Sequence, residues 1–205
     1  MNRQKPFIVE FTGTPEAGKT TTIDLVEQKL LNLGYTVKVY PESAEKSKSI
    51  FPRDSYGKSK FDAKFWMHLE TLKNLVEAPY QNYDIILFDR GALDKKFWIN
   101  LDACNGDFDD RIIYLSKLFD DVLPDLLIVL KVSVDESLRR RGGEGHVVTR
   151  QFLERYNSLL DLFVNSLKIN KDIVCTDNMK VEEVLNVVVN SILENLNKPS
   201  LDGLF

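Results

Sequence analysis

The sequence FIVEFTGTPEAGKT, residues 7–20, decides the fold of this 205-residue chain. Its first part, Phe7 to Phe11, is an almost continuous apolar run, which is typical of a β-strand covered by helices on both faces. Small residues and glycines follow, and from residue 18 to 33 apolar residues recur with helical spacing until Gly34, which suits a left-handed helix cap. The segment therefore predicts a buried strand, a glycine turn and a helix, in that order.

The turn between this strand and this helix fits the pattern G-x-x-x-x-G-K-[ST] of a phosphate-binding loop, or P-loop. In such a loop, backbone N–H groups and the helix N-terminus surround an anion. Lys19 is expected to reach the outer phosphates of a nucleoside triphosphate, and the hydroxyl of Thr20 to ligate Mg²⁺. The residues predicted to bind the nucleotide here are Gly13, Thr14, Pro15, Glu16, Ala17, Gly18, Lys19, Thr20 and Thr21.

Two more apolar runs, Ile85–Phe88 and Leu126–Leu130, predict further buried strands. The alternating segment Thr36–Tyr40 predicts a second or outer strand, and Ile173–Cys175 a last short one, which completes one sheet. Helical patterns lie between them at residues 62–78, after Thr149 and at residues 181–196; the first of these places Phe65, Leu69, Leu72 and Val76 on one stripe. Strands that alternate with helices predict a parallel sheet with right-handed crossovers. The expected fold class is α/β, a three-layer P-loop NTPase fold with five strands flanked by helices, in a single domain over residues 1–205.

Two segments show no such pattern. Ser43 to Lys60 is polar, contains a proline and a glycine, and is predicted to be a mobile loop beside the carboxyl edge of the sheet. Residues 197–205 are predicted to form a loose C-terminal tail. Neither segment has the periodicity of a helix or a strand.

Charge and composition exclude some classes of partner. The formal net charge is −4, which argues against a general nucleic-acid or anionic-membrane binder, because those surfaces need an excess of Lys and Arg. Only two cysteines occur, Cys104 and Cys175, and no apolar stretch follows the start. We therefore expect a cytoplasmic protein whose partner is a small molecule, without nucleic acid or membrane.

Two further strand ends carry residues suited to phosphoryl transfer, because ligands of open α/β sheets collect at the carboxyl edge. Asp89 is predicted to act on magnesium, and Arg90 to hold a phosphate or substrate oxygen; the alternative is a surface ion pair. Glu42 is a candidate general base that removes the proton of a hydroxyl acceptor. The alternative for Glu42 is an exposed loop glutamate, since glutamate is commonly exposed.

Arginines gather after the strand Leu126–Leu130. Between Arg139 and Arg150 there are four arginines and one acid, which gives a local charge of +3. Such a cluster beside glycines predicts a lid, about residues 139–150, that closes over the phosphates and excludes water, with Arg139 and Arg141 as catalytic residues. The alternative is a solvated helix end. Because the P-loop contains Glu16 and no arginine, the lid is expected to supply the positive charge.

Three segments resemble the thymidylate kinase and deoxynucleoside kinase branch of P-loop kinases, and the resemblance spans roughly residues 7–170. They are GTPEAGKTT at 13–21, FDRG at 88–91 and PDLLIVLKVSVDESLRRRGGE at 124–144. The resemblance implies ATP as donor, magnesium, Arg90 at the acceptor, and lid arginines around the donor phosphates and adenine. It also places Thr176 and Asp177 near the adenine, and is compatible with a homodimer.

The sequence also departs from these kinases in ways that concern the acceptor. Pro41-Glu42-Ser43 replaces the Thr-Arg-Glu-Pro turn of thymidylate kinases and is closer to the glutamate turn of deoxynucleoside kinases. Gly91 follows Arg90 where deoxynucleoside kinases usually have serine, and the string up to Asp94 also resembles ribosylnicotinamide-kinase-type domains. We expect a nucleoside or deoxynucleoside kinase. The alternatives are a nucleoside monophosphate kinase of thymidylate kinase type and a regulatory P-loop NTPase without a small acceptor.

Aromatic residues flank these strand ends and can stack on an acceptor base. The set is Phe61, Phe65, Trp66, His68, Phe97 and Trp98. Core packing is the preferred interpretation for most of them, because their spacing is also that of an amphipathic helix. Trp66 lies off the apolar stripe and is therefore the first candidate of this set. Together with the residues near the strand ends, the predicted substrate-binding residues are Glu42, Trp66, Arg90 and Asp94.

Overall fold

A five-stranded parallel sheet organises the computed structural model, which describes residues 5–51, 59–104, 106, 110–145 and 148–197. The strand order is β2-β3-β1-β4-β5. The strands are β1 (Phe7–Gly13), β2 (Val37–Tyr40), β3 (Ile85–Asp89), β4 (Leu126–Lys131) and β5 (Lys171–Cys175). The predicted α/β fold class is confirmed, and each predicted strand is found within two residues of its expected start and end.

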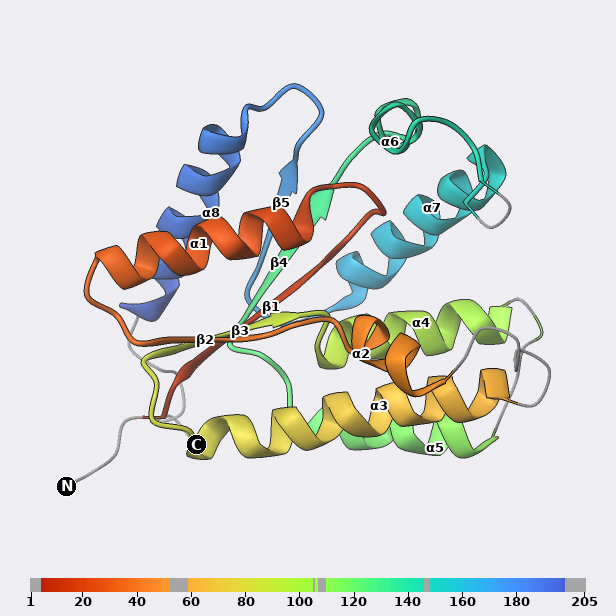
Figure 1. Ribbon diagram of the computed structural model, residues 1–205, viewed down its shortest axis with the longest axis horizontal. Coiled ribbons are helices and arrows are strands. Elements are labelled where there is room, and N and C mark those ends of the chain that lie inside the picture. The colour runs from red at the N-terminus through yellow and green to blue at the C-terminus, as the bar shows by residue number, and fades with distance from the viewer. Residues whose placement is uncertain (1–4, 52–58, 105, 107–109, 146–147, 198–205) are drawn as a thin grey trace.

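Helices cover both faces of this sheet (Figure 1). One face packs against α1 (Lys19–Asn32) and α8 (Val181–Leu196), and the fully buried Val26, Leu30 and Val188 belong to that core. The other face packs against α3 (Ser59–Glu77), α4 (Ala92–Cys104), α5 (Asp110–Leu118) and α7 (Arg150–Ser166). The strands are therefore buried on both sides, which explains their continuous apolar runs.

Two aspartates set the strand register at the amino edge of the sheet. Asp125 Oδ2 accepts a hydrogen bond of 2.7 Å from the backbone N–H of Ile8, at the start of β1. Asp84 Oδ2 accepts bonds of 2.7 Å from both the N–H and the hydroxyl of Thr36, just before β2. Because all strands run in one direction, these anchors lie opposite the carboxyl edge, where Gly13, Tyr40, Asp89 and Lys131 end their strands.

Two short helices complete this carboxyl edge, with the 3₁₀ turns η2 (Ala78–Tyr80) and η3 (Phe119–Asp121) elsewhere. The first, α2 (Ser43–Ile50), shows that the predicted loop over 43–60 was wrong for its first half. Its inward face is polar, with Ser43 and Ser47 buried one turn apart, so apolar periodicity does not reveal it. Residues 52–58 of that loop and 198–205 of the predicted tail lie outside the described residues.

The second short helix, α6 (Val134–Arg141), carries the arginine cluster. Ser133 caps it by accepting a bond from the N–H of Glu136 at 3.3 Å, and it ends at Gly142 with φ 85°. Arg139 and Arg141 therefore lie in the last turn of a helix, and the glycines follow them. Of the predicted lid, residues 146–147 lie outside the described chain.

The predicted apolar stripe of α3 was partly wrong. Leu69 and Val76 are 41% and 50% exposed, whereas His68, Thr71 and Leu75 are buried. The buried face is displaced by about one residue and carries two polar side chains: the hydroxyl of Thr71 bonds that of Ser43 at 3.3 Å, whereas Nδ1 of His68 has no hydrogen-bond partner among the described residues. No helix in the described part of the chain has the length and apolarity needed to cross a membrane.

Candidate active site

The P-loop connects the end of β1 to the start of α1. Gly13 has φ 142°, and a Cβ there would lie 1.9 Å from the carbonyl oxygen of Leu130, so only glycine fits. Gly18, with φ 86°, directly precedes the helix. Lys19 Nζ donates to the carbonyls of Gly13 and Thr14 at 3.2 and 2.9 Å. Burial lowers the pKa of Lys19 to about 8. Nearby carboxylates favour the charged form of the lysine, but they offset the effect of burial only in part.

The two predicted magnesium residues lie together. Thr20 Oγ1 donates a hydrogen bond of 2.9 Å to Asp89 Oδ2, and Asp89 Oδ1 is buried without a partner among the described residues. Burial raises the pKa of Asp89. An orphaned buried carboxylate oxygen beside a hydroxyl fits a hard cation, since Mg²⁺ is usually held by one or two protein oxygens together with phosphates. No group of three or more His, Cys, Asp or Glu side chains among the described residues could hold a metal ion.

Arg90 lies between two carboxylates at the end of β3. Its Nη1 donates to Asp94 Oδ1 and Oδ2 at 3.0 and 3.3 Å. Its Nε lies 3.0 Å from Glu42 Oε1, an ion pair that lacks hydrogen-bond alignment. Burial opposes the charge of Arg90, but Asp94 and Glu42 outweigh it and hold the Arg90 pKa above its usual range. The guanidinium also lies 6.0 Å from the ring centroid of Trp98.

Asp94 differs from its predicted role as a substrate contact. It is fully buried, accepts a bond of 2.7 Å from the Thr12 hydroxyl, and is absent from the residues that line the neighbouring cavity in the described chain. Its contacts hold Arg90 in place instead.

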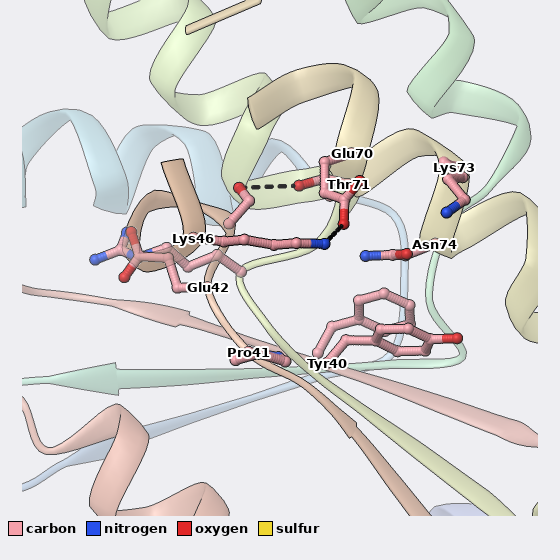
Figure 2. Close-up of a pocket in the computed structure, with 11 residues that line it drawn as sticks. Tyr40, Pro41, Glu42, Lys46, Glu70, Thr71, Lys73 and Asn74 are labelled. Carbon is pink, nitrogen blue, oxygen red and sulfur yellow. Dashed lines mark hydrogen bonds and ion pairs between the residues drawn. The ribbon is translucent and has the colours of Figure 1, made fainter. Parts of the chain in front are cut away.

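A cavity of about 230 Å³ opens beside Glu42 and Arg90. Figure 2 shows residues around it from the end of β2, from α2 and from α3. Its lining is Tyr40, Pro41, Glu42, Ser43, Lys46, Glu70, Thr71, Lys73, Asn74, Phe88 and Arg90. The rings of Tyr40 and Phe88 stack with their centroids 4.8 Å apart. A cavity with an aromatic wall next to a carboxylate and a guanidinium suits a small acceptor with a planar group.

None of the described side chains of the predicted aromatic set lines this cavity, whose aromatic wall is formed by Tyr40 and Phe88 instead. Among the described residues, Trp66 does not line it; the indole contacts Phe51 edge-on at 6.2 Å and the ammonium of Lys46 at 5.9 Å. His68 and Phe97 are buried, as the preferred interpretation of core packing predicted for most of the set. The side chain of Phe61 lies outside the described part.

A second cavity, of about 450 Å³, lies on the other side of the P-loop. It is lined by Glu16, Ala17, Gly18, Thr21, Thr22, Glu136, Arg139, Arg140, Thr176, Asp177, Met179, Val181 and Val184. The structure therefore brings Arg139, Thr176 and Asp177, each predicted near the donor, to one hollow beside the helix N-terminus. Asp177 also accepts bonds of 2.9 and 3.2 Å from the N–H of Ser133.

The arginines of α6 have different surroundings. Arg139 is exposed and paired with Glu136. Arg140 donates to the carbonyls of Glu16 at 3.2 Å and Thr176 at 2.7 Å, and so links α6 to the P-loop. Arg141 Nη1 lies 3.5 Å from Glu16 Oε1. The sequence pattern did not distinguish the role of Arg140 from the roles of its neighbours. Its position one helical turn after Glu136 is the only sequence signal for a structural role.

Sequence reasoning also missed Glu10, a fully buried glutamate in the middle of β1. The signal was present: a charged residue inside an apolar strand requires buried partners.

Comparisons with known proteins agree with this geometry. No protein-family model matches the chain. A probable thymidylate kinase from Methanococcus aeolicus is 23% identical over 196 residues, which are 92% of this chain and 96% of that relative. A solved structure of deoxyadenosine kinase from M. mycoides, with the products dCMP and dCDP, has a TM-score of 0.67 at 21% identity and covers 92% of this chain and 100% of its own.

The chain has the fold of the deoxynucleoside kinases. The same M. mycoides kinase with bound dCTP gives a TM-score of 0.66 at 20% identity, over 92% of this chain and all of that one. With bound dATP the TM-score is 0.62, again at 20% identity, over 91% of this chain. The predicted resemblance to the thymidylate kinase and deoxynucleoside kinase branch of P-loop kinases is confirmed.

Proposed function

We propose that this chain is a nucleoside or deoxynucleoside kinase, which transfers the γ-phosphoryl group of ATP to a hydroxyl of a small nucleoside-type acceptor. The observation that carries the proposal is the ion pair of Glu42 and Arg90 at the wall of the 230 Å³ cavity. It places a carboxylate and a fixed cation beside the P-loop, which are the groups that transfer to a neutral hydroxyl requires.

The donor triphosphate is assigned to the P-loop, with its base in the 450 Å³ cavity. Lys19 is buried at the loop and can exchange its bonds to the carbonyls of Gly13 and Thr14 for bonds to phosphate oxygens. Thr20 and Asp89 would hold Mg²⁺, which supplies charge neutralisation of the phosphates when it is bound. Thr176 and Asp177 border the end of the cavity assigned to adenine.

The acceptor is assigned to the 230 Å³ cavity, with its reactive hydroxyl toward Glu42. Glu42 takes the hydroxyl proton as the oxygen attacks, and Arg90 stabilises negative charge on the acceptor oxygen and the transferred group. Asp94 fixes the guanidinium from behind. Arg139 and Arg141, in the last turn of α6, are assigned to the phosphates during transfer, and form with the following residues the proposed lid.

A monophosphate acceptor is a second candidate, because Lys46 and Lys73 both line the acceptor cavity and the similar protein from Methanococcus aeolicus is a probable thymidylate kinase. Lys46 is already paired with Glu70, which leaves less positive charge for a second phosphate. The hydroxyl acceptor is therefore the better match.

An acceptor panel tests these assignments. ADP release from ATP and Mg²⁺ is measured with nucleosides, deoxynucleosides, their monophosphates and ribosylnicotinamide. The proposal expects stimulation by at least one nucleoside. Stimulation by monophosphates alone would support the second candidate, and release that no acceptor changes would favour a regulatory NTPase. The homodimer stays a prediction, which light scattering of the purified chain tests.

A further inference from the structure

Glu10 is a fully buried carboxylate that the proposed transfer does not use. It lies in the central strand β1, between Phe88 of β3 and Leu127 of β4. Burial raises its pKa to about 7, although backbone N–H groups oppose the shift. Such a group costs free energy to bury, so its contacts indicate what it does.

Those contacts are at the start of α4. Glu10 Oε1 accepts a bond of 2.7 Å from the N–H of Asp94, and Oε2 accepts one of 3.1 Å from the N–H of Leu93. These are the second and third residues of the helix, whose N–H groups have no partner within it. A capping side chain normally satisfies them, but the residue before α4 is Gly91. Glu10, which lies in strand β1, therefore caps helix α4.

Gly91 fits this arrangement. A Cβ at residue 91 would lie 2.7 Å from Glu10 Oε2, closer than real contacts allow. Its φ lies outside the left-handed range, so the backbone does not require glycine there. The room that glycine leaves is filled by the Glu10 carboxylate.

The helix turn that Glu10 holds carries Asp94. Asp94 binds Arg90 Nη1 at 3.0 Å, and Arg90 lines the acceptor cavity. We infer that Glu10 is a positioning residue: by capping α4 it fixes Asp94, and through Asp94 it fixes the Arg90 guanidinium toward the acceptor. As far as it concerns an acceptor, this inference rests on the proposed function.

The first test separates acceptor kinetics from donor binding. Glu10→Gln keeps the size of the side chain but replaces one carboxylate oxygen by an NH₂ group, which is a donor and cannot accept a bond from a backbone N–H of α4. We expect kcat/KM for the acceptor to fall about 10–100-fold, as for other residues that hold a binding group in place, with the Kd of ATP and Mg²⁺ within about two-fold of the parent. Asp125→Asn is the matched control, since Asp125 also accepts a backbone N–H, that of Ile8, but lies at the opposite edge of the sheet. It should lower stability and leave the kinetics unchanged.

The second test is a double-mutant cycle. Gly91→Ala alone should lower kcat/KM, because the methyl group displaces the carboxylate. In a Glu10→Ala background the methyl group has room, so its effect should be clearly smaller and the two losses should not add. Three results would each overturn the inference. They are additive losses in this cycle, a folded Glu10→Gln protein with parental kinetics, and equal losses in donor and acceptor binding. If Glu10→Ala does not fold, the kinetics of Glu10→Gln decide, and parental values there overturn the inference.

A third readout does not depend on the reaction. The chain has two tryptophans, so in a Trp66→Phe background the remaining fluorescence comes from Trp98, whose ring lies 6.0 Å from the Arg90 guanidinium. Glu10→Gln should change this emission, and Asp125→Asn should not. A changed emission in a protein that phosphorylates no nucleoside would contradict the proposed function and keep the positioning role. An unchanged emission would contradict the positioning role.

Discussion

The hydroxyl of Thr20 donates to the carboxylate of Asp89 over 2.9 Å, which joins the first turn of α1 to the end of β3. Under the proposed function, these two side chains would hold the metal ion that accompanies the phosphates of a P-loop nucleotide. The second oxygen of Asp89 is buried and unpartnered within the described chain, so a cation there would satisfy it.

Replacement of the Asp89 carboxylate by a neutral amide should change the magnesium requirement. In Asp89→Asn we expect the Mg²⁺ concentration for half-maximal turnover to rise about 10–100-fold, the range seen when a group around a metal is lost. Binding of ATP in the presence of a chelator should stay at the parental level. Titration of activity against Mg²⁺ checks the first result and calorimetry the second. An unchanged magnesium dependence would remove Asp89 from the metal site.

The base assignment predicts a selective loss in Glu42→Gln. Its kcat should fall by about 10²–10⁴, the usual contribution of a general base, while ATP affinity stays within about two-fold. Glu70→Gln is the matched control, because Glu70 lines the same cavity but pairs with Lys46. Initial rates with the best acceptor from the panel provide the measurement. A Glu42→Gln enzyme as fast as the parent would refute the base.

Neighbouring arginines of α6 should behave differently. Arg140 binds two carbonyls of the P-loop region, so Arg140→Ala should lower the free energy of unfolding by about 1–3 kcal/mol. Arg141 Nη1 lies 3.5 Å from the Glu16 carboxylate and its guanidinium lies beside Gly145, so Arg141→Ala should leave stability unchanged and slow turnover more than it weakens ATP binding. Urea unfolding and steady-state kinetics of both variants test this. Equal losses of turnover and ATP binding in Arg141→Ala would count against its lid role.

Buried His68 predicts a pH dependence of stability. Burial lowers its pKa from 6.5 to about 3, helped by the charges of Lys95 and Lys64. Between these values the unfolded chain binds more protons than the native protein, so stability falls as the pH is lowered through that window. In His68→Phe the new ring can pack on Phe119, and the loss of folding stability between about pH 6.5 and 5 should be smaller by about 2 kcal/mol, at 1.36 kcal/mol for each pKa unit. The acid limb of the curve of stability against pH should therefore be flatter.

The comparison of His68→Phe with its parent isolates that effect. Glu10 acts in the opposite sense, because its pKa is raised from 4.5 to about 7 and its contribution is lost as the pH rises through that range. Both proteins keep Glu10, so its contribution cancels in the difference. An acid limb equally steep in both would show that His68 does not titrate as described.

The sequence predicted what depends on local pattern. Apolar runs identified five strands, and the P-loop motif placed its glycines, Lys19 and Thr20 correctly, because a motif tied to a strand and a helix fixes its own surroundings. The rule that parallel strands end at one edge placed Glu42 and Arg90 at the same edge of the sheet, but their ion pair was not predicted.

Features that depend on contacts across the fold were not predicted. Helix α2 was missed because its buried face consists of serines, and the stripe of α3 was misplaced because His68 and Thr71 face inward. Thr71 and Ser43 bond each other across 28 positions of the chain, a contact that no local pattern indicates. Glu10 was missed for the same reason, since the helix it caps begins more than 80 residues later, with Asp94 separated from it by 84 positions.

Asp84 and Asp125 pin the sheet at the edge away from both cavities, and this has a practical consequence. The residues just before Asp84 form a surface turn in which Asn82 is exposed. A tether or reporter attached there would leave the phosphate-binding edge turned toward the solution. Single molecules fixed to a support through Asn82 should therefore turn over at the rate of the free protein.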